Sequence, residues 1–558
     1  MSDALGTVAG IFELQKTHAQ RESQRRCYGR SGSPDKTHVI NRCVRASVHP
    51  RFRAYNFENF IEKIALKNSE IIYLLEERMR EKFHWDVEKE RQEFHRRMAY
   101  SIRHWKSQLP NLRVIFRDEE IDDLLSESVS YCGQQNDCRG ERFIEFVIRT
   151  GYKDEPKVDK GGKPLLRRTT AVHRAGSRYI YSKDDTLREL FKIYNRFDIN
   201  YIDEKSGRSH FHVACRAGFE DIVEKFLELG QDPDCICLET GDSPLYIAVS
   251  RYHKEMTELL LRNGADPNLI NMYGMTSLHK ICMTRNGDDE LAKMLFEISD
   301  EKYQILQLDA KDTYGRTPLQ WALLAGNKKV AELLLRNGAD PNLADPKGLT
   351  PMHIMCQKFY LGDFSEQFFK INHEKNHLLK VNTVDNLGRT PLHYAVTYLL
   401  LNTVGMVLDQ GADISSFDFP TESHFDECFE VWREDDNFKL KLISGALGIV
   451  ERLEKKGYEM KRSDALTLMT VFAKHGIFEK SVDFDEYCYD VEESMIGAGY
   501  IMMKSSLSLY DLIQLRPNEA ATMLTYSDYY EFACSEKLYE LPQGSIQTCV
   551  LRLFYIRF

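Results

Sequence analysis

The sequence predicts an all-α fold: a solenoid of six to seven helix-turn-helix repeats, flanked by N- and C-terminal helical segments. Two observations carry this prediction. Each of six glycines stands two residues before a variant of Thr-Pro-Leu-His, and segments ending in Gly-Ala-Asp follow three of these motifs about 20 residues later. The glycines recur at intervals of 34, 33, 41, 33 and 40 residues, at Gly207, Gly241, Gly274, Gly315, Gly348 and Gly388.

Composition narrows the class of protein. The chain has 558 residues, 42% of them hydrophobic and 29% charged, as in ordinary globular proteins. Its 75 basic and 85 acidic residues give a formal charge of −10, which argues against nucleic acid as the main partner. We see neither a signal peptide nor an apolar run of about 18 residues, so we expect a cytoplasmic or nuclear protein without a membrane partner. The 13 cysteines are then expected to be reduced.

The N-terminal 160 residues precede the repeats. Residues 1–50 carry eight Lys or Arg against four Asp or Glu and predict a flexible basic tail, either solvated or used for nuclear targeting or RNA contact. Residues 51–160 predict a helical region. Apolar residues recur there at helical spacing between Tyr55 and Leu109, which indicates two long amphipathic helices.

The repeats are predicted over residues 161–420, and each motif has the residues that a helix start requires. In Thr317-Pro318-Leu319-Gln320, the Thr hydroxyl can cap the helix, and Pro fits its first turn. The run Leu333-Leu334-Leu335 belongs to a second helix, which Gly338 can end in a left-handed conformation. Thr170-Ala171-Val172-His173 is a candidate for a degenerate first copy.

A longer duplication lies over the short period. The twelve residues ELLLRNGADPNL occur unchanged at 258–269 and 332–343, and the segments from Phe296 and Phe369 through the next motif align without gaps. A two-repeat unit has therefore been duplicated. The intervals of 41 and 40 residues predict extra residues in a second helix or in the loop that follows it.

Residues from about 163 to 415 resemble the ankyrin-repeat family. The resemblance implies a curved solenoid whose concave side, made of hairpin tips and first-helix faces, binds a target protein without enzymatic activity and without a cofactor. Each tip residue could equally be a solvated turn residue. The tip residues so implied are Lys205, Glu239, Thr240, Tyr273, Tyr314, Lys347 and Leu387.

Residues 421–558 predict a helical C-terminal region, with amphipathic stretches at 440–453, 464–472 and 507–515. From about residue 466 it resembles the PRANC region that follows ankyrin repeats in poxvirus, insect and endosymbiont proteins. That resemblance rests on Leu509-Tyr510-Asp511-Leu512-Ile513, on Tyr529-Tyr530-Glu531-Phe532 and on the final Leu-Pro element.

The PRANC resemblance implies an F-box-like helix that docks on the adaptor of a cullin-RING ubiquitin ligase. The protein would then be a ubiquitin ligase substrate receptor; the alternative is a plain scaffold or inhibitor whose tail only caps the solenoid. The F-box-like residues are Leu541, Pro542, Ile546, Val550, Leu551 and Leu553.

Two patterns could instead indicate metal chemistry. His373-Glu374-Lys375-Asn376-His377 matches the zinc-protease pattern H-E-x-x-H, but the aligned residues 300–304 of the paired segment carry neither histidine. His212, His279 and His353 each precede a cysteine by three residues, at the fourth position of the repeat motif. We interpret the first pattern as coincidence and the second as structural, and we predict no metal site.

Overall fold

The computed structural model divides the chain into two compact units, Met1–Tyr152 and Lys153–Phe558. It describes residues 109–132, 139–177, 183–284, 289–302, 305–358, 361–362, 364–429, 438–477, 502–504, 507–515 and 522–535, with single positions at 87, 89–90, 92–93, 98, 102 and 519. The predicted basic tail of residues 1–50 lies outside the described residues. So do the F-box-like residues after 540 and nearly all of the two helices predicted between Tyr55 and Leu109.

The described part of the first unit includes the helices α5 (Leu112–Ile115), α6 (Asp118–Tyr131) and α7 (Arg139–Arg149). Helices α6 and α7 pack against each other. They bury Leu124 from α6 and Val147 from α7. The Tyr152 hydroxyl donates a hydrogen bond of 2.9 Å to Asp118, which ties the end of this unit to the start of α6.

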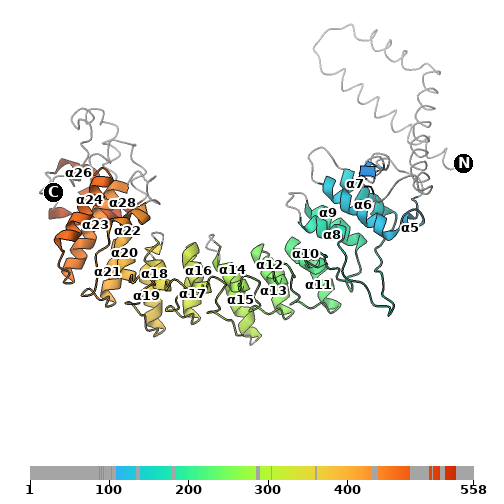
Figure 1. Ribbon diagram of the computed structural model, residues 1–558, viewed down its shortest axis with the longest axis horizontal. Coiled ribbons are helices and arrows are strands. Elements are labelled where there is room, and N and C mark those ends of the chain that lie inside the picture. The colour runs from blue at the N-terminus through green and yellow to red at the C-terminus, as the bar shows by residue number, and fades with distance from the viewer. Residues whose placement is uncertain are drawn as a thin grey trace, which may run out of the picture. The chain divides into compact units, whose positions relative to one another are not determined.

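The second unit contains seven consecutive helix pairs, within the predicted range of six to seven repeats (Figure 1). First helices contact first helices of neighbouring pairs, and second helices contact second helices, so the pairs form one stacked array. The first helices are α8 (Ala171–Ser177), α10 (His210–Ala217), α12 (Pro244–Ser250), α14 (Ser277–Cys282), α16 (Pro318–Ala325), α18 (Pro351–Met355) and α20 (Pro391–Thr397). The second helices are α9 (Lys183–Ile193), α11 (Glu220–Glu228), α13 (Lys254–Arg262), α15 (Glu290–Glu301), α17 (Lys328–Arg336), α19 (Phe364–Glu374) and α21 (Leu401–Asp409).

The first helices start where the motif predicts. The Thr317 hydroxyl accepts a hydrogen bond from the Gln320 amide, and Pro318 occupies the first helical position. Gly338 follows α17 with a φ of 97°, and the Ala339 amide beyond it donates to the Leu334 carbonyl. Because a side chain at that φ would be strained, glycine allows the chain to leave the helix there. The degenerate motif at Thr170 also begins a helix, and α8 and α9 make it a seventh pair.

The duplicated segments, which we call the first copy (258–319) and the second copy (332–392), carry part of their extra residues in their second helices. Helices α15 and α19 have 12 and 11 residues, whereas α13 and α17 have 9 each. The two longer glycine intervals exceed the 33-residue interval by 8 and 7 residues, so the prediction is correct only in part. Most of the remaining extra residues lie between the two helices of a pair, at 283–289 and 356–363, where the other two pairs have only 251–253 and 326–327.

The C-terminal part of the second unit continues the stack. Helices α22 (Glu422–Phe429) and α23 (Phe438–Lys455) pack on α20 and α21, and α24 (Arg462–Lys474) packs on α22. Helix α28 (Tyr526–Cys534) packs along α23, where the Tyr530 hydroxyl donates a hydrogen bond of 2.6 Å to the Leu399 carbonyl. The last ankyrin-like pair is thus covered by later helices.

The prediction of a wholly helical C-terminal region is wrong at one short hairpin. Strands β1 (Met502–Lys504) and β2 (Leu507–Ser508) pair antiparallel just before helix α26 (Leu509–Gln514). The Ser508 hydroxyl accepts from the Asp511 amide and starts the helix there, so residues before it remain extended. The amphipathic stretch predicted from 507 therefore begins its helix two residues later.

Candidate functional site

The tips are the turns that precede the first helices, and a buried carboxylate holds each of three of them in shape. One oxygen of Asp312 accepts the amides of Tyr314 and Arg316, at 2.9 and 2.8 Å. Asp345 and Asp385 make the same pair of bonds in the next two tips. The buried carboxylate thus holds the backbone of an exposed turn in one conformation, and the exposed side chains of that turn are positioned by it.

Neighbouring tips are joined by backbone hydrogen bonds. The Met272 amide donates to the Thr240 carbonyl, the Thr313 amide to Tyr273, and the Asn386 amide to Lys347, all at 2.9 to 3.0 Å. Pro346 occupies the corresponding position in the remaining tip and has no N–H to donate. Its ring packs where a Cβ on Gly315 would stand, 2.5 Å from the proline Cδ.

The predicted tip residues are mostly exposed. Lys205, Glu239 and Lys347 lie in solvent, and Thr240 is half-buried. The side chains of Tyr273, Tyr314 and Leu387 are 56%, 60% and 73% exposed. Whether any of these residues contacts a partner stays a prediction.

The sequence reasoning missed four apolar residues beside the tips. Ile236, Leu238, Ile270 and Met272 are between 52% and 60% exposed, and they belong to the same two successive tips as Glu239 and Tyr273. The sequence could have identified these four residues, because they stand on either side of Cys237 and Asn271, which are buried, and so point outward. Together with Tyr273 they form an apolar row, a feature that monomeric proteins rarely expose without a partner.

The histidines of the motif connect each first helix to the next tip. The Thr350 amide donates to Nδ1 of His353, whose Nε2 donates to the Arg389 carbonyl at 3.1 Å. His279 bridges to the Arg316 carbonyl in the same way. Burial lowers the pKa of both histidines below 6.5 and that of His212 to about 4, so they are neutral at pH 7.

The cysteines that follow these histidines have no role in this bridge. Cys215, Cys282 and Cys356 are fully buried, and burial raises the pKa of each thiol well above its ordinary value. Each histidine Nε2 is used by a backbone carbonyl in the neighbouring turn. The histidine–cysteine spacing therefore has a structural explanation.

The H-E-x-x-H pattern does not lie on one helix face. Helix α19 ends at Glu374, and Asn376 has a φ of 55°, so His373 and His377 belong to a helix end and to the turn after it. Nδ1 of His377 lies 3.1 Å from Oδ1 of Asn372. Within the residues that the structure covers, three or more His, Cys, Asp or Glu side chains do not come together as metal ligands.

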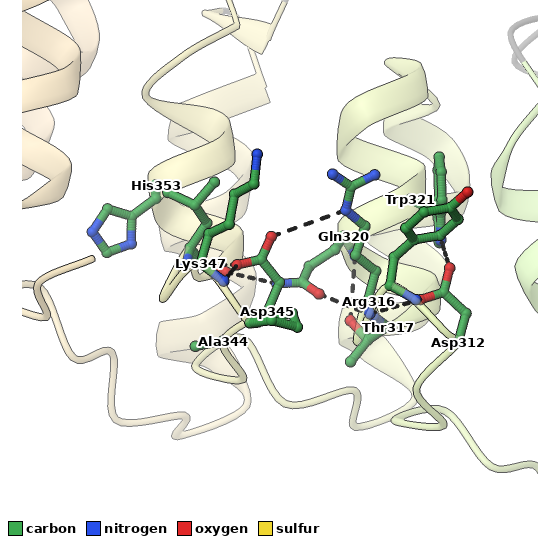
Figure 2. A network of polar contacts seen from close by, with 12 residues as sticks. Asp312, Arg316, Thr317, Gln320, Trp321, Ala344, Asp345, Lys347 and His353 are labelled. Atoms are coloured by element: carbon green, nitrogen blue, oxygen red, sulfur yellow. Dashed lines mark hydrogen bonds and ion pairs between the residues drawn. The ribbon is translucent and has the colours of Figure 1, made fainter. Parts of the chain in front are cut away.

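A polar cluster at the tip of the first copy is shown in Figure 2. The indole N–H of Trp321 donates to the buried Asp312 at 2.8 Å, and the Arg316 guanidinium lies 5.0 Å from the Trp321 ring centre. Nε of Arg316 is 4.0 Å from Oδ2 of Asp345 in the next tip. Trp321 was not predicted as a site residue, although its large ring at an otherwise variable helix position was visible in the sequence.

The PRANC-like residues that the structure describes are mainly internal. Leu509 and Leu512 in α26, and Tyr529, Tyr530 and Phe532 in α28, are buried.

Among the described helices, none is long and apolar enough to cross a membrane.

A family model described as ankyrin repeats (3 copies) matches residues 173–271, 211–305, 245–345 and 337–418. Among curated proteins, the human transient receptor potential cation channel subfamily A member 1 is 29% identical over 215 residues, which cover 36% of this chain and 18% of that protein. The phosphocholine transferase AnkX of Legionella pneumophila is 21% identical over 57% of this chain and 32% of its own length.

Mouse ankyrin repeat and SOCS box protein 16 is 26% identical over 45% of this chain and 57% of its own length. The chain therefore spans less than two thirds of each of these relatives. Among solved structures, the ankyrin repeat domain of Bcl-3 is 22% identical, with a TM-score of 0.33, over 40% of this chain and 98% of that domain.

Proposed function

Because residues 173–418 are ankyrin repeats, we propose that this chain is a non-enzymatic adaptor that binds a target protein along its tips and first helices, the concave face of the array. Ankyrin repeats stack into extended surfaces that serve as binding scaffolds. The proposed contact residues are Lys205, Glu239, Thr240, Tyr273, Tyr314, Lys347 and Leu387.

The apolar row is the observation that carries the proposal. Its side chains (Ile236, Leu238, Ile270, Met272 and Tyr273) are all more than half exposed. They extend over two tips that are hydrogen-bonded to each other. Aromatic and large apolar side chains of this kind are the usual anchors of protein–protein interfaces, where burial against a partner supplies the free energy of binding.

We further propose two alternative roles for the region after residue 420. In the first, the F-box-like residues Leu541 and Pro542, with Ile546, Val550, Leu551 and Leu553, recruit the adaptor of a cullin-RING ubiquitin ligase. The name of one relative, ankyrin repeat and SOCS box protein 16, supports the general plan of ankyrin repeats joined to a second module.

In the second role, the C-terminal region only caps the array. The packing of α22, α23 and α28 against the last helix pair supports this alternative, because a solenoid needs its terminal apolar face covered. The proposed organisation is a basic tail (1–50), a helical N-terminal region (51–160), the repeats (161–420) and a helical C-terminal region (421–558). The proposed location of the protein is the cytoplasm or the nucleus.

Affinity purification with quantitative mass spectrometry tests these proposals on three full-length or nearly full-length chains. The parent chain is compared with Met272→Ser/Tyr273→Ser, which removes the centre of the apolar row, and with a chain ending at residue 540. We expect the tip variant to lose the target protein and the truncated chain to keep it. Recovery of the same proteins by parent and tip variant would contradict target binding by the tips.

The same experiment separates the two roles of the C-terminal region. Loss of a cullin-ligase adaptor from the truncated chain alone would support recruitment. If no such adaptor binds the parent chain, and the truncation lowers the melting temperature, the capping role is favoured.

A further inference from the structure

Two arginines occupy the same position in the two copies, directly before the first-helix motif, but differ in their partners. Arg316 precedes Thr317 and Arg389 precedes Thr390. Both lie over an aromatic ring of the first helix, Trp321 and Tyr394 respectively, at 5.0 and 4.6 Å. The two guanidinium groups therefore differ only in the residues that surround them and in the hydrogen bonds that these residues allow.

In the second copy the arginine is hydrogen-bonded to the aspartate of its own tip. Nε of Arg389 donates to Oδ2 of Asp385 at 3.0 Å, and the Tyr394 hydroxyl donates to the same oxygen at 2.6 Å. The carboxylate is thus shared between the arginine and the phenol, and the arginine has a buried counter-charge at hydrogen-bond distance.

In the first copy the corresponding arginine has no carboxylate at hydrogen-bond distance, and its ion pair with Asp345 of the next tip is long; we call it the open arginine. Oδ2 of Asp312 is bonded by the Trp321 indole, and Arg316 makes no hydrogen bond to it. Among the residues that the structure describes, Nε of Arg316 is buried without a hydrogen-bond partner, and the nearest carboxylate oxygen, on Asp345, is 4.0 Å away. The side chain of Arg316 is 27% exposed, so the accessible part of its guanidinium group can still bind a carboxylate from outside.

The surroundings of Arg316 suit a carboxylate from a partner. Tyr314 and Trp321 lie at 5.9 and 5.0 Å from its guanidinium carbon, so two aromatic rings flank it. The exposed side chain of Lys347 rises on the same side of the tips as Arg316 (Figure 2). A guanidinium group beside a second cation suits a carboxylate, because a planar guanidinium can form two charge-assisted hydrogen bonds to the two carboxylate oxygens.

We propose that Arg316, with Tyr314, Trp321 and Lys347, binds an aspartate or glutamate side chain in an extended segment of the target protein. This inference rests on the proposed function, since it names the chemistry of the segment that the tips bind. Phosphate groups fit less well, because the carboxylates of Asp312 and Asp345 beside the arginine repel the two charges of a phosphate more than the single charge of a carboxylate.

The test uses a phage-displayed library of random 12-residue peptides, selected on the full-length chain and on three variants. Arg316→Gln removes the charge of the proposed site. Trp321→Tyr installs the residue of the second copy, whose hydroxyl allows Asp312 to accept Arg316 as Asp385 accepts Arg389. Arg389→Gln is the matched control, because it changes the same position where the arginine is already paired.

We expect peptides selected on the parent chain and on Arg389→Gln to be enriched in an acidic residue at one position, and those selected on Arg316→Gln and Trp321→Tyr to lack it. For a synthetic selected peptide, fluorescence polarisation should show the dissociation constant rising about tenfold or more with Arg316→Gln or with Glu→Gln in the peptide. When Arg316→Gln is combined with Glu→Gln in the peptide, the dissociation constant should rise no further than with either change alone.

Three results would overturn the proposal. Selected peptides without an acidic preference, or with one that persists in Arg316→Gln, would show that the tips bind protein but not through this arginine, and the proposed function would stand. Selection of no peptide would remove the site. Binding of fluorescent single-stranded DNA in an Arg316-dependent manner would assign the arginine to nucleic acid instead.

Discussion

The two copies share a buried scaffold and differ at their exposed tips. Leu260 and Leu334 occupy the same place in identical segments, and both are fully buried. At the tips, Tyr273 of the earlier repeat corresponds to Lys347 of the later one. Stacking against neighbours constrains the buried side chains in the same way in both copies, whereas the exposed tip side chains Tyr273 and Lys347 are not packed in the core. The scaffold is therefore equivalent, and the surface is not.

The largest effect expected from this comparison concerns the scaffold. Leu260→Ala and Leu334→Ala should each lower the free energy of unfolding by about 2–5 kcal/mol, because each leaves a cavity between stacked helices. Urea denaturation followed by circular dichroism measures both. A cost several times greater in one copy than in the other would show that the two scaffolds are not equivalent.

The second prediction concerns the paired and the open arginine. Arg389→Gln should lower the free energy of unfolding by about 1–3 kcal/mol, because the buried Asp385 loses a charge-assisted hydrogen bond. Arg316→Gln should change it by about 0.5 kcal/mol or less, because that side chain makes no hydrogen bond within the described residues. Thermal denaturation of both variants is the measurement, and equal losses would contradict the difference between the two tips.

The third prediction concerns pH. A buried neutral histidine binds protons less readily in the folded chain than in the unfolded one, so the free energy of unfolding falls as the pH drops below about 6.5. Gln320 already replaces the motif histidine in α16: its side-chain oxygen accepts the Thr317 amide, and its Nε2 donates to the Leu343 and Leu349 carbonyls.

His353→Gln should therefore keep the bridge between repeats and reduce the loss of stability between pH 6.5 and 5 by about 1 kcal/mol. Denaturation midpoints over this pH range check it, with Gln320→His as the reciprocal variant. An unchanged pH slope in His353→Gln would mean that this histidine is not kept neutral by the fold.

The smallest effect on stability is expected at the tips. Tyr273→Ala and Tyr314→Ala should change the free energy of unfolding by about 0.5 kcal/mol or less, since both side chains are more than half exposed. Paired melting and target-binding measurements on each variant separate the roles. A large loss of stability would place these tyrosines in the scaffold instead of on a binding surface.

Much of the array could be predicted because its signals are local. Threonine and proline at a helix start, and glycine after a helix end, act within one turn of the chain. The longer glycine intervals appear only in part as longer second helices, because most of the remaining residues lie in the connections between paired helices. The hairpin at β1 and β2 was missed because its residues also fit a helical pattern, and only the cap at Ser508 decides between the two structures.

The arrangement at Arg316 could not be predicted from the motif. It depends on the identity of one ring, Trp321 instead of tyrosine, and on a carboxylate 29 residues away in the next tip. The Arg and the Asp of the tip are present in both copies, so their pattern alone does not distinguish the open arginine from the closed one. Only the hydrogen-bond geometry separates them.

Pro346 gives the array a mechanical asymmetry. Where other tips are joined through the amide at this position, the tip that contains Pro346 is joined to the preceding repeat by side chains. The Lys311 ammonium donates to the Ala344 carbonyl at 3.0 Å, and Nε2 of Gln320 donates to the Leu343 and Leu349 carbonyls. The contact between these two tips therefore depends on side chains, where the neighbouring tips use a backbone amide. Substitutions of those side chains act on the joint between the two repeats, whereas the other joints keep their backbone bond whatever side chain the tip carries.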